Sequence, residues 1–127
     1  MLIAYASAGF AYATSPKATW ASGPLTITFP AATGTGSGPG SFTCSPSISG
    51  ITLRILVSNP MRMSLTATPS SFSSCSSTPD TVMLTAHCLV SATLCRGSYQ
   101  GLVQIRQPDN YRDIPANQKI VITVTVT

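Results

Sequence analysis

Apolar and polar residues alternate in several short runs along this chain of 127 residues. The clearest run is KIVITVTVT at residues 119–127, where Ile120, Ile122, Val124 and Val126 occupy every second position. Successive side chains of a strand point to opposite faces, so a period of two is typical of a half-buried strand. We therefore expect the last run to be a strand with these four side chains in the core.

The same period predicts strands elsewhere, and turn signals separate them. We expect Met61, Met63 and Leu65 to share one face of such a strand. No apolar period of 3.6 persists for three turns, so very little helix is expected. The chain then has about seven strands at the spacing of an antiparallel β-sandwich. The other expected strands lie near residues 25–29, 51–57, 82–88 and 99–105.

Three segments between the expected strands have the composition of connections. The run TGTGSGPGS at residues 33–41 predicts a flexible loop, since the Lys-Ser/Thr and helix of a phosphate-binding loop do not follow it. The Ser-rich residues 70–80 predict a second connection, which Cys75 would hold in place. The acid- and proline-containing residues 107–118 predict a third loop before the last strand.

Charged residues make up only 8% of the chain, and Ser, Thr, Gly and Pro replace them. Ser and Thr compete with the helix backbone for hydrogen bonds, which again favours strands. The net charge of +4 comes from scattered cations that form no run, so we do not expect nucleic-acid binding. A surface with so little charge is suited to packing against copies of itself.

The four cysteines are an even number in a small chain, which favours two disulfides and an oxidising compartment. Zinc is the alternative, but the close pairs of cysteines that zinc sites use are absent from the sequence. The most economical pairing joins two cysteines across a tight hairpin and two between strands, although four cysteines allow three pairings. These pairs would be Cys88 with Cys95 and Cys44 with Cys75.

We divide the chain into an N-terminal extension, residues 1–17, and a sandwich domain, residues 18–127. The first 14 residues are apolar and rich in small side chains, which is typical of the remnant of an export signal or of an extended strand. The stretch is shorter than the ~20 residues of a transmembrane helix, so no membrane span is expected. No basic residue precedes Lys17, which weighs against the signal.

Catalytic chemistry has little support in the sequence, and we expect no enzyme, metal or cofactor. Asp80, Asp109 and Asp113 are the acids, and His87 is the one histidine. Asp109 and Asp113 lie on one loop and could supply the two carboxylates of a glycosidase, but their role as turn-forming residues is the simpler explanation. We expect His87 to face solvent.

An alternative is a sugar-binding platform made of the aromatic residues Trp20, Tyr99 and Tyr111. Trp20 is more simply a core anchor. We keep Tyr111, with Asp109 and Asp113 beside it, as the candidate ligand loop.

Both ends of the chain are apolar and strand-like, and an unpaired strand edge there would invite association with other chains. The last run has one Lys at its start and otherwise lacks the charge, proline or bulge that protects an exposed edge. The economical solution is exchange, in which residues 1–14 of one subunit complete the sheet of the next and build a filament. Alternate side chains of that strand would then fill pockets, namely Leu2, Ala4, Tyr5, Phe10 and Tyr12.

The Ser/Thr/Gly-rich chain with its cysteines, the GSYQGLVQI run and the terminal VITVTVT resemble spore coat protein U domains and, more distantly, chaperone-usher pilins. The resemblance lies mainly in the last third of the chain. It implies an immunoglobulin-like sandwich completed by a donor strand from a neighbouring subunit.

Our leading hypothesis is therefore an extracellular, pilin-like structural subunit whose partners are copies of itself. One alternative is a monomeric secreted module that binds carbohydrate or a surface through residues 30–41 and 107–118, and another is a viral coat or tube protein.

Overall fold

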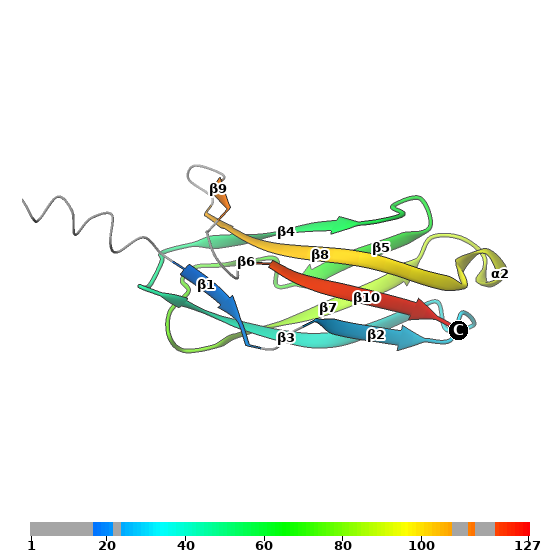
Figure 1. The fold of residues 1–127 in the computed structure, drawn as a ribbon, viewed down its shortest axis with the longest axis horizontal. Helices are drawn as coiled ribbons and strands as arrows, with labels where there is room; N and C mark the ends of the chain where they lie inside the picture. Colours follow the sequence, from blue (N-terminus) through cyan, green and yellow to red (C-terminus); the bar gives the residue numbers. More distant parts are fainter. Residues whose placement is uncertain (1–16, 22–23, 108–111, 114–118) are drawn as a thin grey trace, which may run out of the picture.

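The computed structural model describes residues 17–21, 24–107, 112–113 and 119–127, which form two facing β-sheets (Figure 1). In this part of the chain the one helix is α2, and it is four residues long. The predicted all-β sandwich with very little helix is therefore confirmed. The elements are β1 (Lys17–Trp20), β2 (Leu25–Phe29), β3 (Thr35–Ser45), β4 (Ile51–Val57), β5 (Met63–Thr68), β6 (Ser71–Phe72), β7 (Asp80–Cys88), α2 (Ala92–Cys95), β8 (Gly97–Gln107), β9 (Arg112–Asp113) and β10 (Lys119–Val126).

The two sheets have the strand order of an immunoglobulin-like sandwich. The first sheet runs β1-β3-β7-β5, and the second runs β2-β10-β8-β4-β6, with β9 also paired to β8. When β1, β3, β4, β5, β7, β8 and β10 are lettered A to G, the first sheet has the order ABED and the second contains GFC, as in the immunoglobulin fold. Neighbours are antiparallel except β2 and β10, which are parallel. The consecutive strands β1 and β2 belong to different sheets.

The alternating residues of β10 supply a row of core side chains. Ile120, Ile122, Val124 and Val126 are each no more than 3% exposed. The strand prediction for the end of the chain, including its core face, is confirmed.

An aromatic group fills the part of the core near β1. The Trp20 ring meets Phe42 edge to face with centroids 5.1 Å apart, and Phe42 meets Phe72 at 5.2 Å. Trp20 is only 7% exposed, as expected of a core anchor. Edge-to-face pairs of this kind each contribute about 0.5–1.5 kcal/mol beyond the area that they bury.

The prediction of a flexible loop at residues 33–41 is wrong, because most of this run belongs to β3. The glycines at every second position turn toward the sandwich interior, beneath β2 and Trp20. A Cβ atom added to Gly36 would lie 2.5 Å from the Cδ1 atom of Phe29, and one added to Gly40 would lie 3.1 Å from the Cζ3 atom of Trp20. Glycine is needed here because its missing side chain lets these rings approach the β3 backbone.

Pro39 is accommodated within β3 by the direction of its nitrogen. The Cys88 amide donates to the Gly34 carbonyl at 2.8 Å, which fixes the alternation of bonded pairs between β3 and β7. By that alternation Pro39, opposite Met83, turns its nitrogen away from β7. The strand therefore loses no ladder hydrogen bond to the proline.

Two further expectations need correction. The last strand is no edge, because β10 lies between β2 and β8 in its sheet. Met61 does not share the core face of Met63 and Leu65, since it precedes β5 and is 83% exposed. The amides of Arg62 and Met63 both donate to the Asn59 carbonyl, at 3.1 and 3.0 Å, so a turn carries Met61 outward.

No helix in the described ranges has the length and hydropathy to cross a bilayer.

Candidate functional site

The four cysteines form two disulfides, in the pairing that the sequence analysis favoured. Cys44 of β3 bonds to Cys75, and both are almost fully buried. Cys75 also exchanges backbone hydrogen bonds of 2.8 Å with Ile48, so the Ser-rich connection is fastened to the core. This bond links two points that are 31 residues apart in the sequence.

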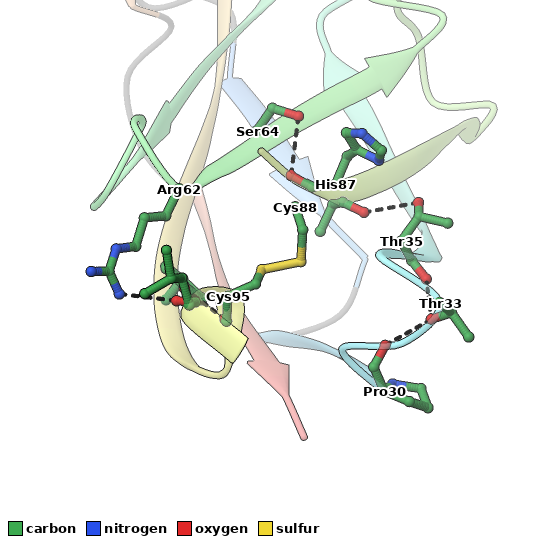
Figure 2. The surroundings of a disulfide bond; sticks show 11 residues. Pro30, Thr33, Thr35, Arg62, Ser64, His87, Cys88 and Cys95 are labelled. Atoms are coloured by element: carbon green, nitrogen blue, oxygen red, sulfur yellow. Dashed lines mark hydrogen bonds between the residues drawn. A yellow bond between two sulfur atoms is a disulfide. The ribbon is translucent and has the colours of Figure 1, made fainter. Parts of the chain in front are cut away.

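The second disulfide, Cys88–Cys95, closes the loop between β7 and β8 (Figure 2). The amides of Leu94 and Cys95 donate to the Ser91 carbonyl and form the single turn of α2. The buried Tyr99 hydroxyl donates to the Cys95 carbonyl at 2.7 Å. The disulfide therefore joins the two ends of the loop, and the Tyr99 hydroxyl holds its last residue from the core side.

Several predicted site residues lie outside the described part of the chain. These include Asp109 and Tyr111 of the candidate ligand loop. Asp113 lies in β9, where its backbone pairs with Arg106. The strand contacts proposed for the N-terminal extension are also outside, namely Leu2, Ala4, Tyr5, Phe10 and Tyr12.

Two of the three aromatic residues considered for a sugar-binding platform are buried. Trp20 and Tyr99 are 7% and 5% exposed, so their ring faces are not available to a sugar. His87 lies exposed on the outer face of the first sheet, between Thr35 and Ser64 on the neighbouring strands. Within the described ranges, no three His, Cys, Asp or Glu residues are grouped as metal ligands.

Over part of its length, the outer edge of β4 carries backbone groups that pair with no described strand. β6 pairs only with Ile51 and Thr52, and the Leu53 amide then donates to the Ser70 carbonyl at 2.9 Å. Backbone groups of a strand point alternately to its two sides. Ile55 and Val57 therefore direct their N–H and C=O groups to the same outer edge as Leu53, where no described strand pairs with them.

The side chains on this edge are incompletely covered. Leu53, Ile55 and Val57 pack against the core but are only partly buried, whereas Val103 and Ile105 of the neighbouring β8 are fully buried. β5, the last strand of the first sheet, lies along the same side of the molecule (Figure 1). We call the outer edges of β4 and β5 the open side of the sandwich. An added strand here would gain backbone hydrogen bonds and cover apolar surface.

Sequence reasoning placed the exposed edge on the wrong strand. The signal that could have located it is the Ser-rich segment 70–79, from which a longer neighbour for β4 would have to come. That segment supplies only the two-residue β6 before Cys75 fastens it to the core.

No protein-family model and no curated protein sequence matches this chain. Among solved structures, the chain is similar to the CooA pilin subunit from enterotoxigenic Escherichia coli. The two are 16% identical, the match covers 89% of this chain and 99% of that one, and the TM-score is 0.48.

Proposed function

We propose that this protein is a structural subunit of an extracellular filament or surface coat, and that its copies join by strand addition at the open side. The observation that carries the proposal is the outer edge of β4 at Ile55 and Val57. There, unpaired backbone groups coincide with partly buried apolar side chains. Exposed edges of this kind accept extended segments from other chains.

The two disulfides support an extracellular location, because such bonds persist in oxidising compartments. The outer faces support close packing of copies. The first sheet presents mainly hydroxyl side chains outward, and short neutral side chains can be buried against a neighbour without the desolvation cost of a charge. The outward hydroxyl residues of its three longer strands are Thr35, Ser37, Ser41, Thr43, Ser45, Ser64, Thr66, Thr68, Thr81 and Thr85.

The strand that we assign to this edge is residues 1–14 of the neighbouring subunit. Its backbone would bond to Ile55 and Val57, and its apolar side chains would cover the partly buried side chains of Leu53, Ile55 and Val57. Each subunit would then accept one strand and give another. Head-to-tail contacts produce a filament when the rotation between subunits does not close into a ring, and we propose this open arrangement here.

The test removes one outward hydrogen-bond donor. Ile55→Pro deletes an N–H that points away from β8, so the ladder to β8 stays intact, and proline is tolerated on such an edge. Ile55→Val is the matched control, because it keeps the N–H with a side chain of similar size. Deletion of residues 1–14 removes the strand itself.

We expect the full chain and Ile55→Val to form filaments, seen by negative-stain microscopy and sedimentation. Ile55→Pro and the deletion should stay monomeric, with the circular dichroism of a folded β protein. A monodisperse full-length monomer would overturn the proposal and favour a monomeric binding module. Filaments of Ile55→Pro as abundant as those of Ile55→Val would place the contact elsewhere.

A further inference from the structure

The α2 end of the molecule carries an exposed apolar surface. Met61 is 83% exposed, Leu89 50% and Leu94 51%, and all three lie on two loops at this end (Figure 1). The other large apolar side chains that are exposed in the described ranges lie on the sheet faces: Leu56 and Val121 on either side of Leu102 in the second sheet, and Met83 in the first. We call the two loops, residues 58–62 and 89–96, the tip.

Hydrogen bonds join the two loops of the tip into one surface. The Leu89 amide donates to the Arg62 carbonyl at 2.8 Å, and the Nη1 atom of Arg62 donates to the Leu94 carbonyl at 2.9 Å. Figure 2 shows Arg62 reaching across to the loop that the Cys88–Cys95 disulfide closes. The exposed side chains are thus held on a fixed backbone, which lowers the entropy cost of binding through them.

The tip also carries two exposed cationic side chains, and no acid of the described ranges lies near them. Arg62 and Arg96 are both exposed. The acids in the described ranges, Asp80 and Asp113, lie at the opposite end, where β7 begins and where β9 pairs with β8. A surface with apolar side chains flanked by arginines matches the interface of an anionic bilayer, where apolar groups enter the headgroup region and cations meet lipid phosphates.

We propose that the tip binds the surface of anionic lipid membranes, with Met61, Leu89 and Leu94 inserted at the interface and Arg62 and Arg96 on lipid headgroups. A second copy of the chain fits this surface less well when it is joined tip to tip. Two tips facing each other would bring four arginines together with no described acid between them, and like charges oppose such a contact. The proposal is independent of filament formation.

Vesicle flotation tests it, because filaments alone sink whereas bound protein rises with the lipid. The full chain is mixed with vesicles of phosphatidylcholine and phosphatidylglycerol at 3:1, or of phosphatidylcholine alone. We expect flotation with the anionic vesicles and its loss at high salt. Leu89→Ser with Leu94→Ser should lower the partition coefficient by roughly tenfold or more, since half-exposed leucines lose their burial.

Arg96→Gln should lower the partition coefficient by roughly fivefold, the effect of one cation near an anionic surface. Met83→Ser and Arg54→Gln are the matched controls, because they remove an exposed apolar side chain and an exposed cation from the sheet faces. Both should float like the unmodified chain.

Three results would overturn the proposal. The first is no flotation of the unmodified chain. The second is equal flotation with neutral and anionic vesicles. The third is flotation that survives the double leucine substitution, which would assign it to another segment such as residues 1–14. Loss of self-association instead of flotation in the leucine variant would show that the tip binds a second copy.

Discussion

Gly36→Ala adds one methyl group at the point where β2 packs on β3. The added Cβ would lie 2.5 Å from the Cδ1 atom, 2.9 Å from the Cγ atom and 3.0 Å from the Cβ atom of Phe29. Phe29 is only 4% exposed, and the added atom would meet its Cβ and Cγ atoms as well as its ring, so rotation of the ring about its own axis cannot relieve the contact. The ring or the backbone of β3 must therefore move.

Gly38→Ala is the matched control, because it makes the same change on the same face of the same strand. Its Cβ would lie 3.6 Å from the Cγ1 atom of Ile27 and no closer than 3.7 Å to Leu25, which are ordinary contacts. Neither glycine has the positive φ that alanine would resist. The two substitutions differ only in the space that each methyl group meets.

The two substitutions should change the free energy of unfolding in opposite directions. Replacing glycine by alanine restricts the unfolded chain and stabilises a compatible site by about 0.4–1 kcal/mol, whereas overpacking costs about 1–3 kcal/mol. Gly38→Ala should therefore gain about 0.4–1 kcal/mol, and Gly36→Ala should lose roughly 0.5–2 kcal/mol. For a domain of this size, 1 kcal/mol shifts Tm by about 4 °C.

Urea and thermal unfolding followed by circular dichroism, with both disulfides intact, measure the two changes. Gly36→Ala should melt below the unmodified chain and Gly38→Ala at or above it. If both lose stability equally, then β3 tolerates no side chain and the close approach of Phe29 is not the reason for glycine. If Gly36→Ala is neutral, then β2 is not packed on β3 as described.

Two more predictions concern the disulfides and the loop that one of them closes. Replacing Cys44 and Cys75 by alanine should cost more stability than replacing Cys88 and Cys95, about 3.7 against about 2.4 kcal/mol from loop entropy alone, since the loops span 31 and 7 residues. Urea midpoints of the two double variants measure this, and the reverse order would show that loop entropy is not the main term. Tyr99→Phe should cost about 1–2 kcal/mol, because it removes the buried hydrogen bond to the Cys95 carbonyl. The same assay checks it, and an unchanged midpoint would mean that this carbonyl needs no donor.

Much of the fold could be predicted from local patterns. The alternation in residues 119–127 predicts both a strand and its buried face, because every second side chain of a strand is buried when one face lies on the core. The position of Trp20 in the core could be anticipated for the same reason. The glycines of β3 also recur with a period of two, but an alternation of glycine with Ser, Thr and Pro carries no apolar signal and is typical of a loop.

The candidate site could not be located in this way. The unpaired edge at Ile55 and Val57 depends on how far β6 extends along β4, and that is decided where the Cys44–Cys75 bond fastens the Ser-rich segment. The tip brings Met61 and Leu94 together through Arg62, although they are far apart in the sequence. Neither arrangement has a local signature.

The sequence by itself determined that this chain is an all-β sandwich with its cysteines suited to disulfides, because strand periodicity and residue preferences act over a few neighbouring residues. The tertiary structure alone decided which strands lie at the edges, why β3 needs glycine beneath Phe29, and which exposed side chains share a surface. The physical reason is that strand neighbours and side-chain contacts join residues distant in the chain. Their energies depend on packing between elements, which no single segment encodes.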